Sequence, residues 1–174
     1  MIIFLIGFMG CGKSYTSKQL AALLDMPVMD MDKFIEEREG KTIREIFEEK
    51  GESYFRQLEH DFLKNLSADE HLIIATGGGA PCYFDNMDIM NQKGLTIYLN
   101  RNRERCLAQL MKGVEKRPLL KGMTAEEIAD FYDRKIQERK PFYEQAKWLI
   151  GDAEAEQMAE WIKERYLPNA PKSS

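Results

Sequence analysis

The stretch IIFLIGFMGCGKSYTSKQLAALL, residues 2–24, contains the features that decide the fold. Five apolar residues, 2–6, predict a buried strand, and the residues from Ser14 onward have the spacing of an amphipathic helix. Between them, Gly7 is followed after four residues by Gly12-Lys13-Ser14, which is the P-loop pattern in its expected place between strand and helix. This arrangement predicts an α/β protein whose first loop binds a phosphate group.

The residues of this loop have separate expected roles. Glycines let the backbone curl so that successive N–H groups converge on an anion, and the following helix adds free N–H groups and a positive dipole end. Lys13 is predicted to reach the terminal phosphates of a nucleoside triphosphate, and Ser14 to ligate a Mg²⁺ ion shared with them. The expected nucleotide-binding run is Gly10, Cys11, Gly12, Lys13, Ser14 and Tyr15.

The composition indicates a single domain that binds neither nucleic acid nor a membrane. A chain of 174 residues, 44% of them hydrophobic, can bury one core, and a net charge of −4 gives no positive field for nucleic acid or anionic lipid. No apolar run approaches the ~20 residues that cross a bilayer, so we expect a cytoplasmic protein, and a monomer. The three cysteines and two histidines have no zinc or disulfide spacing, and the cysteines are expected to be small apolar filler.

Apolar runs alternate with helical patterns along the chain. The runs at 2–6, 27–30, 71–75, 95–99 and 147–150 predict five strands of a parallel sheet. Thr124-Ala-Glu-Glu127 predicts a capping box that opens a helix running toward Gln137, and residues 154–166 predict a last helix. We therefore expect a single-domain three-layer α/β/α sandwich over residues 1–167, with residues 168–174 as a frayed tail.

Two carboxylates follow the second apolar run. Asp30 and Asp32 come at the carboxyl end of a predicted strand, where ligands of α/β sheets bind. One could hold metal-bound water while the other accepts a proton from an attacking hydroxyl group. Alternatively, or in addition, one of the two could cap the helix expected to begin near Lys33, with Asp32 as the favoured residue.

Three glycines, Gly77, Gly78 and Gly79, follow the third run and predict close contact between bare backbone and a small ligand, with a flexible turn as the alternative. A GTPase or motor ATPase would have an Asp at the end of this strand, and the chain has Thr76. The guanine-binding pattern Asn-Lys-x-Asp is also absent from the sequence. A regulatory GTPase is therefore not favoured.

Arg56 and Glu59 are neighbours on one face of a predicted helix. Most such pairs are solvated and contribute little to stability. The apolar residues around this pair instead favour the wall of a pocket: Tyr54, Phe55, Leu58, Phe62 and Leu63. An arginine held by a glutamate there suits the bidentate binding of a carboxylate.

Together these motifs resemble the shikimate kinase family from Met1 to about Tyr166. The motifs are the P-loop, Asp-x-Asp, Phe-Arg-x-x-Glu (55–59), Thr-Gly-Gly-Gly (76–79), Arg-Pro-Leu-Leu (117–120) and Arg-x-Pro-x-Tyr (139–143). The resemblance implies a P-loop kinase that uses ATP and Mg²⁺ to phosphorylate the 3-hydroxyl of shikimate, on the route to chorismate and the aromatic amino acids. A gluconate-type kinase and a non-catalytic nucleotide-binding module are the alternatives.

The resemblance also implies roles for individual residues. Lys13 and Ser14 would bind ATP and magnesium, with Asp30 on the metal through water, and Asp32 would bind the acceptor hydroxyl. Arg56 and Arg139 would bind the shikimate carboxylate, Gly77, Gly78 and Gly79 would line the ring, and Arg117 would be a lid arginine over the phosphates. The implied catalytic set is Lys13, Asp32 and Arg117.

The segment around Arg117 has the features of a lid. Residues 112–121 carry three Lys and one Arg against one Glu, Gly113 and Gly122 lie near its ends, and Pro118 restricts its backbone. We expect a lid over residues 112–122, with a solvated basic loop as the alternative.

Two positions depart from the family pattern. Where the family often has an arginine that stacks on adenine, this chain has Leu110, with Lys112 as a possible substitute. The loop near Gly151–Glu154, expected as a second adenine contact, also does not clearly match.

Overall fold

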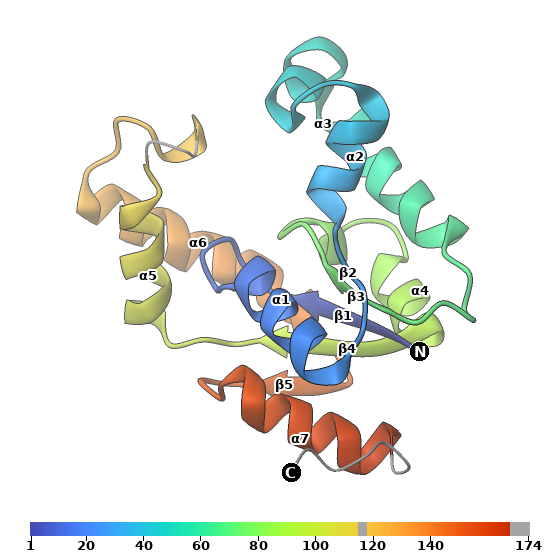
Figure 1. The fold of residues 1–174 in the computed structure, drawn as a ribbon. Coiled ribbons are helices and arrows are strands. Elements are labelled where there is room, and N and C mark those ends of the chain that lie inside the picture. Colours follow the sequence, from blue (N-terminus) through green and yellow to red (C-terminus); the bar gives the residue numbers. More distant parts are fainter. Residues whose placement is uncertain (115–117, 168–174) are drawn as a thin grey trace.

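The computed structural model describes residues 1–114 and 118–167, and in them five parallel strands form one sheet in the order β2-β3-β1-β4-β5 (Figure 1). The strands are β1 (Ile2–Ile6), β2 (Val28–Asp30), β3 (Leu72–Ala75), β4 (Gly94–Leu99) and β5 (Trp148–Ile150). The helices are α1 (Lys13–Leu24), α2 (Met31–Glu39), α3 (Ile43–Asn65), α4 (Asn86–Lys93), α5 (Arg103–Lys112), α6 (Ala125–Tyr143) and α7 (Ala155–Tyr166), with short 3-10 turns η1 (Ala80–Cys82) and η3 (Pro118–Leu120). All five predicted strands are confirmed to within one residue at each end.

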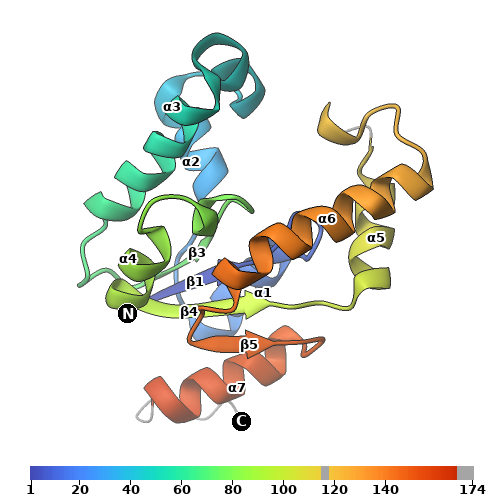
Figure 2. The same ribbon diagram turned by 180° about the vertical axis from the view of Figure 1, so that it is seen from behind.

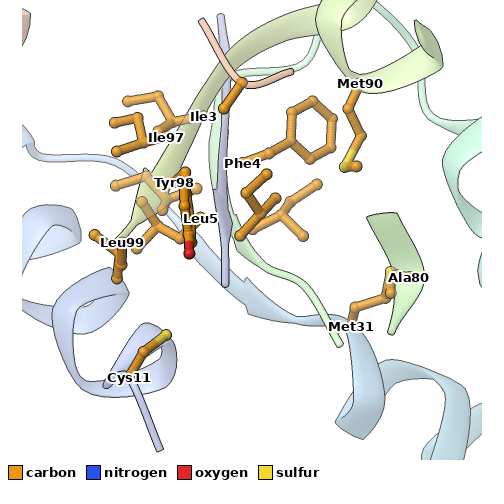
Figure 3. Packing of buried hydrophobic residues seen from close by; sticks show 14 of the residues in the cluster. Ile3, Phe4, Leu5, Cys11, Met31, Ala80, Met90, Ile97, Tyr98 and Leu99 are labelled. Carbon is orange, nitrogen blue, oxygen red and sulfur yellow. The ribbon is translucent and has the colours of Figure 1, made fainter. Parts of the chain in front are cut away.

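Helices cover both faces of the sheet, as the predicted three-layer sandwich requires. α1 lies in front of the strands in Figure 1, with α7 packed against α1, and α4 and α6 lie in front of them in Figure 2. This arrangement explains the sequence of β1, in which every residue is buried and apolar, because a central parallel strand faces packed side chains on both sides. Figure 3 shows Phe4 and Leu5 among side chains of β4 and Met90 of α4.

The end of β2 differs from the sequence prediction. Asp30 is the N-cap of α2, where its side chain accepts from the backbone N–H groups of Asp32 and Lys33 at 3.1 and 3.3 Å. The prediction that Asp32 could cap a helix beginning near Lys33 is therefore wrong. Asp32 lies in the first turn of α2 because the chain turns from strand to helix directly at Asp30.

Helix α6 begins as predicted but extends further than expected. Thr124 and Glu127 form the capping box, and the helix continues past Gln137 to Tyr143. Pro141 lies in the last turn, where it removes one N–H donor, but the backbone of Glu144 still bonds to that of Lys140 at 2.9 Å. Because the helix includes this turn, Tyr143, which is four residues after Arg139, lies on the same helix face as Arg139.

Part of the predicted lid and the predicted tail fall outside the described residues. Arg117 is among residues 115–117, and the tail comprises residues 168–174. After this gap in the lid segment, Leu120 is fully buried whereas Leu119 is 66% exposed. Among the helices of residues 1–114 and 118–167, none is both long and apolar enough to cross a bilayer.

Candidate active site

The loop between β1 and α1 presents backbone N–H groups and one ammonium group. Gly10 and Gly12 have φ values of 80° and 87°, which residues with a side chain rarely adopt, and no side chain caps the first turn of α1. Lys13 Nζ donates to the carbonyl oxygens of Gly7 and Phe8 at 2.7 and 2.9 Å, so the ammonium group is held across the loop. This arrangement of donors suits the oxygens of a polyphosphate.

Ser14 and Asp30 form a pair of oxygen ligands beside this loop. Ser14 Oγ donates to Asp30 Oδ2 at 2.8 Å. A hydroxyl and a carboxylate are hard oxygen donors, the type that Mg²⁺ prefers when a substrate phosphate and water supply the remaining ligands. The two residues therefore fit a magnesium ion shared with a nucleotide.

The loop lines a cavity of about 600 Å³. Its lining comprises residues 9–16 with Asp30, Asp32, Thr76, Gly78, Arg105 and Gln109. Every residue of the predicted nucleotide-binding run lines it; Cys11 is 5% exposed and Tyr15 is 66% exposed. Cys106 is buried as well, as the filler role predicts.

A second cavity, of about 720 Å³, adjoins the first. Its lining comprises Met9, Asp32, Ile43, Arg44, Phe47, Glu48, Phe55, Arg56, Glu59, Gly77, Gly78, Gly79, Leu119, Lys121 and Arg139. Met9, Asp32 and Gly78 line both cavities. Asp32 therefore lies where a group bound in one cavity would meet a group bound in the other.

The three glycines allow four side chains to approach the backbone of residues 77–79. A β-carbon at residue 77 would lie 2.7 Å from Glu59 Oε1 and 2.9 Å from Asp32 Oδ1, and one at residue 79 would lie 2.7 Å from Arg56 Cζ. One at residue 78 would lie 3.6 Å from Arg139 Nη1. Gly77 and Gly79 are thus needed for close packing within the site, whereas a β-carbon at residue 78 would make ordinary contacts; the packing at 77 and 79 supports a defined contact surface over a merely flexible turn.

Arg56 and Glu59 form a buried pair, so the surface ion pair considered from the sequence is excluded. Arg56 is 8% exposed and Glu59 is 0% exposed, and Arg56 Nη1 donates to Glu59 Oε2 at 2.8 Å. Burial raises the pKa of Glu59 to about 7 and outweighs the opposing effect of Arg56. Glu59 Oε1 and Asp32 Oδ1 are both buried without a hydrogen-bond partner among the described residues.

Two further residues hold the Arg56 guanidinium, and the sequence analysis did not identify them. Glu52 Oε1 accepts from Arg56 Nη2 at 3.2 Å and from the Tyr83 hydroxyl at 2.8 Å, and Arg56 Cζ lies 4.3 Å from the centre of the Tyr83 ring. Glu52 precedes Arg56 by one helical turn, which was a usable signal in the sequence. Tyr83 reaches the site from another element, after η1, and no local pattern indicates it.

Asp32 has the environment of a proton acceptor. Burial raises the pKa of its carboxyl group, the nearby Asp30 carboxylate raises it further, and the Lys13 ammonium opposes both effects. A raised pKa makes a carboxylate a stronger base than an exposed aspartate. Asp32 is thus the more deeply buried carboxylate, whereas Asp30 bonds to Ser14 and to the first turn of α2.

Arg139 and Tyr143 approach the glycines from α6. Arg139 Cζ lies 5.4 Å from the centre of the Phe8 ring, and the Tyr143 hydroxyl donates to the Gly78 carbonyl at 2.6 Å. The cavity lined by Arg56 and Arg139 therefore has two guanidinium groups near one backbone segment, which suits a small ligand bearing a carboxylate.

The sequence is similar to those of known proteins of one family. The sequence model of the shikimate kinase family matches residues 9–167. The chain is 42% identical over 154 residues to the shikimate kinase of Bacteroides thetaiotaomicron, with 88% of each chain covered. It is 43% identical over 147 residues to that of Bacteroides fragilis, with 84% of this chain and 82% of the other covered. The chain belongs to the shikimate kinase family.

Solved structures of shikimate kinases have the same fold. The enzyme from Bacteroides thetaiotaomicron aligns with a TM-score of 0.85 at 36% identity, covering 94% of this chain and 97% of the other. The structure from Acinetobacter baumannii, described as a complex with shikimate, aligns with a TM-score of 0.81 at 34% identity, covering 98% and 95%. Both the resemblance to shikimate kinases and the P-loop kinase fold expected from the sequence are confirmed, and the chain is an enzyme of the kinase class.

Proposed function

We propose that this enzyme transfers the γ-phosphoryl group of ATP to the 3-hydroxyl group of shikimate, giving shikimate 3-phosphate and ADP. The observation that carries the proposal is the position of Asp32 on the shared boundary of the two cavities. ATP would occupy the cavity of the phosphate-binding loop, and shikimate the cavity with Arg56 and Arg139. The acceptor hydroxyl would then lie beside both Asp32 and the γ-phosphate.

In the proposed reaction Asp32 accepts the proton of the 3-hydroxyl group. The hydroxyl oxygen forms a bond to the γ-phosphorus, and the bond from this phosphorus to the β–γ bridging oxygen breaks, which leaves ADP. Lys13 stabilises the negative charge on the phosphates during transfer. The buried Glu59 keeps the Arg56 guanidinium oriented toward the shikimate carboxylate, while Arg139 binds the same carboxylate from α6.

Ser14 and Asp30 would hold Mg²⁺, Asp30 through a water molecule. When bound, the ion neutralises charge on the phosphate oxygens and orients them. The Ser14–Asp30 hydrogen bond of 2.8 Å supports this assignment because it keeps the two oxygen ligands together.

Residues 112–122 are proposed to close over the bound substrates as a lid, with Arg117 reaching the phosphates. In support, Leu119 and Lys121 of this segment line the acceptor cavity although Leu119 is largely exposed. A closed lid would exclude water, which would otherwise compete with shikimate for the phosphoryl group. We also propose that the enzyme acts as a monomer in the cytoplasm.

A coupled assay of ADP release with shikimate, with gluconate and with no acceptor tests the proposed function. We expect turnover with shikimate alone, together with a ³¹P NMR signal of a phosphate monoester on the product. Turnover with gluconate would support the gluconate-type kinase instead. ATP binding without turnover on either acceptor would support the non-catalytic module.

A further inference from the structure

The helix α5 runs past the phosphate-binding loop and presents two different faces. Its buried face packs on the loop: a β-carbon at Gly10 would lie 3.0 Å from Leu110 Cδ2 and 3.3 Å from the Cys106 carbonyl oxygen. Leu110 is 0% exposed. It is therefore part of the core under the loop, and it cannot provide a surface for a nucleotide base.

The adjacent stripe of α5 lines the nucleotide cavity. Arg105 and Gln109, four residues apart and hence on one helix face, both contribute to the lining. Lys112, considered from the sequence as a substitute for the family's arginine, is exposed and does not line this cavity. Among the described residues that line the cavity of the phosphate-binding loop, Arg105 is the only arginine.

Arg105 is held by the loop that was expected to contact adenine. Its Nη1 donates to Glu154 Oε1 at 3.1 Å and lies 3.8 Å from Asp152 Oδ1. The hydrogen bond to Glu154 uses an N–H group at the edge of the guanidinium plane, and the Arg105 side chain is 42% exposed. A planar guanidinium fixed at its edge can stack on an aromatic ring system at a low cost in side-chain entropy.

The same loop is attached to the start of α5 at further points. Asp152 Oδ1 accepts from the backbone N–H of Asn102 at 3.1 Å. Arg101, which is 5% exposed, donates to the carbonyl oxygens of Gly151 and Ala153. The backbone of this loop and the Asp152 carboxylate are therefore held against the start of α5.

We infer that Arg105 is the base-binding residue of this enzyme: its guanidinium, held by Glu154 and Asp152, packs on the adenine ring of ATP in place of an arginine at position 110. The inference rests on ATP being the phosphoryl donor of the proposed function. Arg105 then makes the contact with the base, and the loop at residues 151–154 orients Arg105.

The test compares Arg105→Ala with Arg103→Ala by calorimetric titration in Mg²⁺. Arg103 is a matched control because it lies on the same helix, is similarly exposed, and has its own ion pair, with Asp133 at 2.6 Å. Each variant is titrated with ATP and with inorganic tripolyphosphate, which has the charge of the phosphates but no base. We expect Arg105→Ala to weaken ATP about tenfold and tripolyphosphate less than twofold. Arg103→Ala should change both less than twofold.

A third variant, Arg105→Lys, keeps the charge and loses the planar group. ATP should still bind at least threefold more weakly than to the wild type, and this variant also replaces Arg105→Ala should that protein fail to fold. Equal weakening of ATP and tripolyphosphate would show that Arg105 acts only as a charge. Unchanged ATP affinity in Arg105→Ala, or full recovery in Arg105→Lys, would overturn the inference. Because these are binding measurements, they remain decisive even if the wild type fails to phosphorylate shikimate.

Discussion

The two cavities of this enzyme are built in different ways. The phosphate end of the nucleotide cavity consists of consecutive residues, 9–16, whose backbone N–H groups and one lysine form the binding surface. In the acceptor cavity, the charged side chains that meet at the glycines of residues 77–79 come from α2, α3 and α6. One site is therefore a property of local backbone geometry, whereas the other exists only when the sheet and its helices are packed.

The two cavities also differ in the chemical groups that they use. The phosphate-binding loop uses main-chain groups that any folded copy of the loop presents. The acceptor cavity contains a buried ion pair, Arg56–Glu59, and burial of charges is costly unless the packing around them is well defined. We expect substitutions in the acceptor cavity to affect stability and binding together, and substitutions at the boundary to affect mainly the rate of transfer.

The largest expected effect is that of Asp32→Asn, which changes the charged residue that lines both cavities. The amide has the same shape but cannot accept the proton, so kcat should fall about 10²- to 10⁴-fold. Calorimetry should show ATP and shikimate binding within a few-fold of the wild type. A variant that keeps its kcat and loses shikimate affinity would make Asp32 a binding residue of the acceptor cavity alone.

Truncation of Arg139 should affect binding in the acceptor cavity and leave binding in the nucleotide cavity unchanged. Arg139→Ala leaves the substrate carboxylate without one of its partners, and we expect shikimate binding to weaken by ~2 to 4 kcal/mol with ATP binding unchanged. Arg134→Ala, an exposed arginine of the same helix that lines neither cavity, is the matched control. Titration of each variant with shikimate and with ATP gives the four affinities. Similar shikimate affinity in both variants would contradict a carboxylate site at Arg139.

A pH titration of stability should show a signature of the acceptor cavity. The pKa of Glu59 is raised from 4.5 to about 7, so the folded protein holds this proton more tightly than the unfolded chain. The stabilisation is complete below pH 4.5 and is lost as the pH rises through 7. The free energy of unfolding of the wild type, relative to Glu59→Gln, should therefore fall by on the order of 2 kcal/mol between pH 5 and 7.5. Chemical denaturation at several pH values measures this difference, and parallel pH curves for the two proteins would contradict it.

Features that depend on residues close in sequence could be predicted, whereas features that depend on contacts between distant segments could not. The five strands, the phosphate-binding loop and the capping box at Thr124 depend on residues close in sequence, and all were predicted. Asp32, Arg56 and Arg139 were identified by their motifs, and the structure brings all three to the acceptor cavity. Arg117 stays a prediction because it lies outside the described residues.

The features that were missed depend on contacts between distant segments. Tyr83 was not foreseen beside Arg56 because η1 and α3 meet only in the folded protein. The burial of Leu110 follows from its contact with Gly10, exactly a hundred positions earlier in the chain, and no local pattern reveals that contact. A helix cap by one of the two aspartates was expected, with Asp32 as the favoured residue, whereas Asp30 caps α2 because the chain turns sharply after β2.

The smallest expected effect concerns Tyr143, which joins α6 to the glycine that lines both cavities. Tyr143→Phe keeps the buried ring and its packing on Tyr98, at 5.1 Å between ring centres, but removes the hydrogen bond to the Gly78 carbonyl. We expect a loss of ~1 kcal/mol in the free energy of unfolding. KM for shikimate should rise two- to fivefold, because the Tyr143 hydroxyl no longer holds the Gly78 backbone that Arg139 approaches. The value of kcat should change less. Tyr166→Phe, at a tyrosine of α7 that lines neither cavity, is the control and should leave both constants unchanged. If Tyr143→Phe lowers stability without any change in KM, the tyrosine supports the fold alone and the position of Gly78 is set by the sheet.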